Sequence, residues 1–270
     1  MSDHESSAGV EVDSTGPWWG EWTLDEGETR WWALGALLVG VHRKAREWRV
    51  GYEYFAEGTA MLPMSERSVD ELKTASRYIF SRTGGELKIS PALADRAVVT
   101  RPVSPLYLPP GEETLMYVSS QAWVRVEAVD PGKVLLDVPS VRPSDTWFGP
   151  STRDGELCYA SKTHARLVLE DLPRQPFRAV TPLQIVNESD SEMMLERVSL
   201  PVTGLTLYAS EAGELWTQSV SMRAGRDRQL ASLKLKDQPP GQIENPVVVS
   251  APREIHHERD LVRAFSSIFT

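Results

Sequence analysis

The sequence contains a single cysteine, Cys158, and lacks any long apolar run. One cysteine cannot form a disulfide within the chain. The longest apolar stretch, residues 31–41, is interrupted by Gly35 and Gly40, and it falls short of the ~20 residues that a membrane-spanning helix needs. The opening Met-Ser-Asp-His-Glu-Ser-Ser lacks the basic and apolar regions of a signal peptide. We therefore expect a soluble, cytoplasmic protein without direct membrane insertion.

Positive charge is also in short supply, because the formal net charge is −9. Binding to nucleic acid requires a concentrated basic surface that neutralises phosphates, so we expect no nucleic-acid partner. The same balance weakens attraction to anionic lipid. Arg43, Lys44, Arg46 and Arg49 are clustered, but acidic residues follow closely. We interpret this cluster as the solvated edge of a hairpin.

Catalytic and metal-binding spacings are missing as well. The stretch from Gly16 to Gly20 lacks the lysine and hydroxyl of a phosphate-binding loop, and no serine lies in a nucleophile elbow. His256-His257 would diverge on a helix. Cys158 and His164 would lie about 20 Å apart on an extended strand, at ~3.3 Å per residue. We expect no catalytic residue, no metal and no cofactor.

What the sequence does contain is a β-type pattern. Nineteen prolines and eighteen glycines would interrupt many helices, and apolar residues alternate with polar ones in short segments. Six tryptophans fall between Trp18 and Trp48, and we interpret them as core residues of paired strands. The predicted strand faces are Trp48, Val50, Tyr52 and Tyr54; Ala122, Val124, Val126 and Ala128; and Val134, Leu136 and Val138.

The pattern predicts a mainly β fold with two packed β-sandwich-like units and a C-terminal α-helix. We expect a disordered tail over 1–16, an N-terminal β-sandwich domain over 17–175, a smaller β unit over 176–245 and the helix over 246–270. The helix is predicted from an amphipathic spacing of apolar residues. That stripe consists of Ile255, Leu261, Val262, Phe265, Ile268 and Phe269.

The segment 144–160 is the candidate functional site. It combines the tandem aromatics Trp147-Phe148 with charged side chains and hydroxyls. Polar loops rarely carry two such rings unless the rings dock in the core or on a partner. We predict a non-enzymatic binding or regulatory module whose main surface feature is lined by these rings together with Asp145, Arg153 and Glu156.

A carbohydrate-active enzyme or a lectin-like protein is the alternative for the same segment. Asp145, Asp154 and Glu156 are close in sequence, and Trp147 could stack on a sugar ring. A glycoside hydrolase would need two carboxylates about 5–10 Å apart in one cleft. The opposing interpretation is structural, with Asp145 capping a turn, Asp154-Gly155 forming a hairpin turn and Glu156 pairing with an arginine.

Several fragments, taken in order, make the chain resemble the domain-of-unknown-function family numbered 432, which occurs in archaea and bacteria. The resemblance covers about residues 17–240. The fragments are Trp31–Leu37, Arg101–Leu106, Pro109–Glu112, Ser144–Gly149, Gly155–Ala160, Pro182–Asn187 and Leu215–Thr217.

The resemblance implies no activity and transfers no catalytic residue. It does imply one candidate partner, because genes for small mechanosensitive channels lie beside genes of such family members. A protein partner or a small ligand of unknown identity is otherwise expected. A sheet edge left uncovered would also permit a homo-oligomer.

Overall fold

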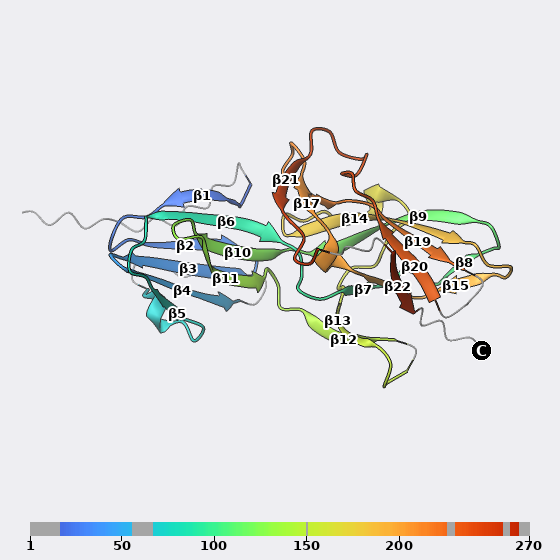
Figure 1. Ribbon diagram of the computed structural model, residues 1–270, viewed down its shortest axis with the longest axis horizontal. Coiled ribbons are helices and arrows are strands. Elements are labelled where there is room, and N and C mark those ends of the chain that lie inside the picture. Colours follow the sequence, from blue (N-terminus) through green and yellow to red (C-terminus); the bar gives the residue numbers. More distant parts are fainter. Residues whose placement is uncertain (1–16, 56–66, 150, 226–229, 256–259, 265–270) are drawn as a thin grey trace, which may run out of the picture. The chain divides into compact units, whose positions relative to one another are not determined.

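The structure is a computed structural model that describes residues 17–55, 67–149, 151–225, 230–255 and 260–264 (Figure 1). It is mainly β, as the sequence pattern predicts, and its strands form several sheets. The predicted tail over 1–16 lies outside the described residues.

The chain folds into two compact units that each combine separate stretches of sequence. Unit 1 comprises the chain up to Pro91 together with Trp123–Arg142, and unit 2 comprises Ala92–Ala122 and the chain from Pro143 onward. This division differs from the predicted contiguous domains, 17–175 and 176–245. The segment Trp123–Arg142 belongs to unit 1 because its strands complete a sheet whose first strand lies near the N-terminal end of the described chain.

Unit 1 contains two four-stranded sheets, ordered β1-β6-β10-β11 and β2-β3-β4-β5. The 3-10 helix η2 (Val69–Glu71) precedes β5. The strands are β1 (Gly20–Thr23), β2 (Thr29–Leu34), β3 (Leu37–Lys44), β4 (Glu47–Tyr54), β5 (Ser76–Ile79), β6 (Glu86–Ala92), β10 (Trp123–Ala128) and β11 (Lys133–Pro139).

Tryptophan side chains contribute to the core of unit 1. Trp48 is fully buried on β4, and its Nε1 donates to Thr83 Oγ1 at 2.8 Å. Trp31 and Trp32 are also buried, on opposite faces of β2. The ring of Trp31 lies where a side chain on Gly40 would have to sit, which explains a glycine in the middle of β3. The core interpretation of the tryptophan cluster is confirmed for these three residues.

Alternation located the faces of β4 and β10, but on β11 it located only Val138 correctly. Ala122, Val124, Val126 and Ala128 are all buried, as predicted. In β11, however, Leu135 is buried and Val134 is exposed. The register between β10 and β11 shifts between Val126 and Glu127, and a shift of one residue exchanges the faces of a strand.

Unit 2 contains an eight-stranded sheet, a four-stranded sheet ordered β12-β13-β7-β16 and a pair of strands, β8 and β15. Its two 3-10 helices are η3 (Leu169–Asp171) and η4 (Val202–Gly204). The strands are β7 (Val98–Thr100), β8 (Leu106–Leu108), β9 (Glu113–Gln121), β12 (Ser144–Phe148), β13 (Glu156–Ala160), β14 (Arg178–Asn187), β15 (Met193–Leu195), β16 (Val198–Leu200), β17 (Leu207–Ala209), β18 (Leu215–Thr217), β19 (Val220–Ala224), β20 (Leu230–Leu235), β21 (Val247–Ser250) and β22 (Asp260–Ala264).

Strand β14 is the centre of the large sheet. It pairs with β9 along one side and with β18 and then β19 along the other. Pro182, which lacks an N–H group, lies between the residues of β14 that pair with β18 and those that pair with β19. A proline is tolerated there because no ladder bond is required at the junction between two partner strands.

The predicted C-terminal α-helix over 246–270 is wrong. Residues Val247–Ser250 form β21, and Asp260–Ala264 form β22, which pairs antiparallel with β20. Short apolar runs fit a helix face and a strand equally well, and the available edge of β20 decides for a strand here. The remaining residues of the predicted helix that lie at 256–259 and 265–270 are outside the described part of the chain.

Candidate functional site

The predicted site segment 144–160 forms an antiparallel hairpin of β12 and β13 (Figure 1, yellow-green). The register pairs Thr146 with Cys158, Trp147 with Leu157 and Phe148 with Glu156. Neighbouring residues of a strand point to opposite faces. Trp147 and Phe148 are adjacent, so their rings lie on opposite faces of the hairpin.

The inner face of the hairpin fastens it to unit 2. Phe148 and Cys158 are buried and pack with Ala97 and Val99. The guanidinium of Arg197 lies 5.3 Å from the centre of the Phe148 ring, within the range of a cation–π contact. Phe148 was predicted to line a surface feature, and the structure places it in the core instead.

The outer face of the hairpin carries an exposed apolar pair. Trp147 is 40% exposed, and Leu157, its direct partner across the two strands, is 48% exposed. Such cross-strand pairs contact each other through their side chains. Tyr159 lies on the same face, two residues along β13 from Leu157, and the guanidinium of Arg96 lies 5.1 Å from its ring centre.

Asp145 and Arg96 add a polar border to this outer face. Arg96 Nη1 lies 3.4 Å from Asp145 Oδ1, and the Tyr159 hydroxyl donates to Asp95 Oδ1 at 2.9 Å. Burial and the hydrogen bond to Asp95 raise the pKa of Tyr159. The tyrosine is therefore a neutral hydrogen-bonding group at physiological pH, beside an apolar pair.

The turn between the strands folds back on the indole of Trp147. Trp147 Nε1 donates to the carbonyl oxygen of Ser151 at 2.8 Å, and Ser151 Oγ lies 3.1 Å from Asp154 Oδ2. A side chain on Gly155 would come within 2.8 Å of the indole, so glycine permits the close approach. The predicted residue Arg153 is exposed on this turn.

Strand β12 is an edge of its sheet, so part of its backbone is directed away from β13. Tyr159 N–H and Ser161 N–H donate to the carbonyls of Ala97 and Val99. Since the direction of backbone groups alternates along a strand, the backbone N–H and C=O groups of Cys158 and Glu156 point toward β12. By the same alternation, the backbone groups of Asp145 and Trp147 point toward the edge that no described strand covers, where the Trp147 carbonyl accepts from Arg197 Nη1 at 3.3 Å.

The three carboxylates proposed for sugar hydrolysis do not form one site. Asp145 lies on the outer face with Trp147, whereas Glu156 lies on the inner face opposite Phe148. Ser199 Oγ lies 3.4 Å from Glu156 Oε1, and Asp154 contacts Ser151 in the turn.

The thiol of Cys158 is not arranged as a nucleophile. It is completely buried, and burial raises its pKa. A thiol becomes nucleophilic when its environment lowers the pKa. His164 is exposed, and the contacts of the thiol are Ser199 Oγ at 3.9 Å and the Glu156 carbonyl oxygen at 3.8 Å.

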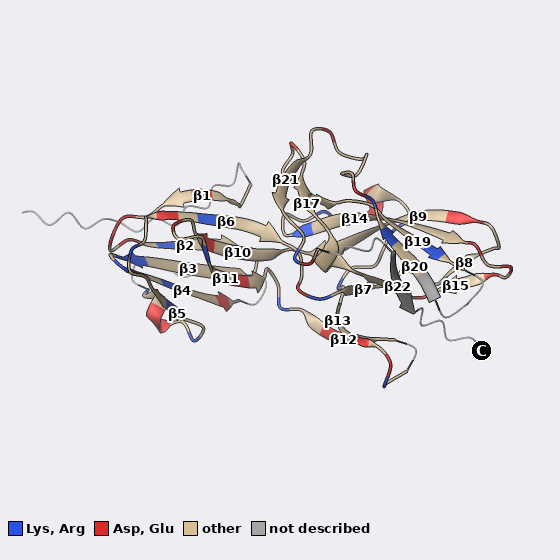
Figure 2. Ribbon diagram, in the orientation of Figure 1, with Lys and Arg blue, Asp and Glu red and all other residues tan. Residues whose placement is uncertain are grey.

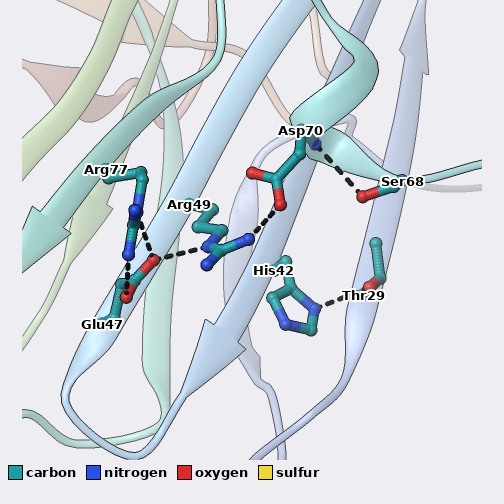
Figure 3. Close-up of polar contacts among 7 residues, drawn as sticks. All are labelled: Thr29, His42, Glu47, Arg49, Ser68, Asp70 and Arg77. Carbon is teal, nitrogen blue, oxygen red and sulfur yellow. Dashed lines mark hydrogen bonds and ion pairs between the residues drawn. The ribbon is translucent and has the colours of Figure 1, made fainter.

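Unit 1 contains a second polar feature that the sequence did not identify as a site. Glu47 accepts two hydrogen bonds from Arg77, at 2.8 and 2.9 Å, and one from Arg49 at 2.5 Å (Figure 3). Arg49 also contacts Asp70. An open hollow adjoins this cluster, lined by Glu26, Gly27, His42, Lys44, Ala45, Arg46, Glu47 and Ile79.

The charges of this cluster are largely satisfied internally. Hydrogen bonds from Arg77 and Arg49 lower the pKa of Glu47 to about 2, so its carboxylate is not available as a general base near neutral pH. Burial, followed by the charges of Lys44 and Arg49, lowers the pKa of His42. Its Nδ1 lies 2.8 Å from Thr29 Oγ1. The cluster ties β4, β5 and η2 together.

Charged residues of both signs are interspersed along the described strands (Figure 2). Within the described residues, no group of three potential metal ligands is found, and His256-His257 lie outside them. Across those same stretches of the chain, none of the helices has the length and apolar character needed to cross a bilayer.

Comparison with known proteins assigns the chain to a family without assigning an activity. No curated protein matches the sequence. No solved structure matches the chain either. The family model described as "Protein of unknown function (DUF432)" matches residues 18–270, and the chain belongs to that family.

Proposed function

We propose that this protein is a non-enzymatic, cytoplasmic binding module whose β12–β13 hairpin captures a protein partner. The observation that carries the proposal is the exposed cross-strand pair of Trp147 and Leu157 on an edge strand. Aromatic anchors surrounded by polar groups are typical of the centres of protein interfaces. Asp145, Arg96 and Arg153 supply that polar surround.

The support for a protein partner comes from the backbone as well as the side chains. The edge of β12 that no described strand covers offers the backbone groups of Asp145 and the N–H of Trp147 to an added strand, while the carbonyl of Trp147 already accepts from Arg197 Nη1 at 3.3 Å. The side chains of Trp147 and Leu157 would then contact alternate residues of that strand. The inner-face contacts of Phe148 support a rigid platform, which reduces the entropy lost on binding.

The hairpin supports binding better than it supports catalysis. Asp145 and Glu156 belong to opposite faces, which argues against two carboxylates acting across one cleft. The buried thiol of Cys158 argues against nucleophilic chemistry. A lectin-like role for Trp147 is the second candidate, because an exposed indole supports stacking on a sugar. A glycan array without a bound glycan would remove it.

The partner itself is a separate proposal. The family resemblance supplies one candidate, a small mechanosensitive channel. Co-purification of the tagged protein with such a channel from detergent-solubilised host membranes would support it. A second copy of this chain is the other candidate, since an open strand edge can pair with itself. Analytical ultracentrifugation of the purified protein distinguishes a self-associated form from a monomer that binds a foreign chain.

The test compares two leucines of similar exposure in unit 2. Leu157 is 48% exposed on the hairpin, and Leu167 is 50% exposed elsewhere. Truncating an interface anchor costs about 2 kcal/mol, or about thirtyfold in affinity. We expect Leu157→Ser to lose partner capture from host lysate while Leu167→Ser keeps it, with both variants unfolding at similar temperatures. Equal capture by the two variants would refute the proposal.

A further inference from the structure

Arg178 is a largely buried cation that lacks a carboxylate partner among the described residues. It begins β14 in unit 2. Its Nε donates to Ser119 Oγ at 2.7 Å, and its Nη2 donates to the Ser119 carbonyl oxygen at 2.5 Å and to Thr163 Oγ1 at 2.7 Å. Desolvation lowers the pKa of Arg178 to about 10, and no acidic group offsets it. Buried charges in proteins are normally paired with an opposite charge.

The hydroxyl groups of Ser119, Ser161 and Thr163 lie around this guanidinium, and we call this cluster the cradle. Thr163 Oγ1 lies 3.0 Å and Ser161 Oγ 3.2 Å from the carbonyl oxygen of Ser119, which also accepts from Arg178. Three donors thus converge on one carbonyl oxygen, which has two lone pairs. The Nη1 group of Arg178 has no hydrogen-bond partner among the described residues. Ser161 Oγ also donates to the carbonyl oxygen of Thr163 at 3.0 Å, so the unused donors of this cluster are the two N–H groups of Nη1.

The surroundings of the cradle add positive charge. Lys162 and His164 flank Thr163 in sequence and are exposed. Ala165 N–H donates to the carbonyl of Arg101, which brings a further basic residue beside the same segment. Ser161 and Thr163 are only partly buried, so solvent and small solutes reach this segment. Arginine and hydroxyl donors together are the groups that bind phosphate oxygens.

We propose that Arg178, Ser161 and Thr163 form a binding site for a phosphate-type oxyanion. The anion accepts hydrogen bonds from the N–H groups of Nη1. It also accepts from the two hydroxyls once these turn away from the carbonyl oxygens of Ser119 and Thr163, and it supplies the negative charge that the buried arginine lacks. The site lies in unit 2 and uses none of the residues of the β12–β13 surface. It is independent of the protein-binding proposal.

The test is equilibrium dialysis of the full chain against radiolabelled inorganic phosphate at constant ionic strength set with sodium chloride. We expect saturable binding that Arg178→Met abolishes. Thr163→Val removes one hydroxyl from the cradle and should weaken binding by about tenfold, the effect of one hydrogen bond to a charged group. Arg174→Met is the control, because it removes an exposed arginine of the same unit that pairs with Glu214.

Competition identifies the source of the anion. A nucleoside monophosphate that competes more strongly than sulfate would assign the site to an organic phosphate, whereas equal competition would assign it to a free oxyanion. Thermal unfolding of each variant without phosphate confirms that it is folded during dialysis. Non-saturable binding to the wild-type protein, or undiminished binding to folded Arg178→Met, would overturn the proposal and leave Arg178 as a clamp that fastens residues 161–163 to β9.

Discussion

Replacing Phe148 by alanine should make the chain's single thiol accessible while the protein is still folded. Phe148 is 5% exposed and packs in the same cluster as Cys158, which is completely buried. The truncation of a core phenylalanine costs about 3–5 kcal/mol. Since about 1.4 kcal/mol corresponds to a factor of ten, the open population around Cys158 should rise between about a hundredfold and a few thousandfold.

The assay is the rate of reaction of Cys158 with an aromatic disulfide reagent under native conditions. A buried thiol reacts through transient opening, and when closing is fast the rate follows the open population. Trp147→Ala is the matched control from the adjacent position, where the indole is 40% exposed. We expect it to change the rate by less than about tenfold.

Two results would refute this reasoning. If Trp147→Ala accelerated labelling as much as Phe148→Ala, the indole would belong to the core and the outer face of the hairpin would not be a binding surface. If the wild-type thiol reacted as fast as a free cysteine, the inner-face packing of the hairpin would be wrong.

The remaining predictions concern unit 1. The pKa of Glu47 is about 2 in the folded protein, below its ordinary value of 4.5, so its ion pairs stabilise the protein above pH ~4.5 and lose that effect as pH falls toward 2. Glu47→Gln should reduce the loss of stability between pH ~4.5 and ~2 in urea unfolding, and an unchanged pH dependence would contradict the assignment. Thr83→Val leaves the buried Nε1 of Trp48 without its acceptor and should cost about 1–3 kcal/mol in urea unfolding, whereas Thr83→Ser should recover most of this. Gly40→Ala places a methyl group within 2.8 Å of the Trp31 ring and should cost about 1–3 kcal/mol; a neutral effect in thermal unfolding would show that the ring moves aside easily.

The alternation of apolar and polar residues predicted the buried strand faces where it was regular. It failed where the pairing with a neighbouring strand decided which residues are buried. The faces of β4 and β10 follow directly from their apolar period. The burial of Leu135 instead of Val134 depends on an irregularity opposite Val126 and Glu127, which a single strand's sequence does not encode. The C-terminal segment forms strand β22 because it pairs with the edge of β20. That pairing depends on the tertiary structure and cannot be read from the segment's own sequence.

The burial of the residues in the predicted segment followed only partly from the sequence. The sequence drew attention to residues 144–160, yet the two adjacent rings were both assigned to the surface. On a strand, adjacent side chains point in opposite directions, so only Trp147 could join the outer face once Phe148 was buried. The polar cluster of unit 1 was missed because Glu47 and Arg77 are distant in sequence, although alternating Glu47 and Arg49 on β4 was a usable signal.

Site-specific photo-crosslinking from the outer face of the hairpin tests the central proposal most directly. A benzophenone amino acid is introduced at Leu157 in one protein and at Leu167 in another, and both are irradiated in host lysate. The proposal predicts one discrete adduct, identified by mass spectrometry, from position 157 and none of the same mass from position 167. The same adducts from both positions, or none from 157, would contradict it.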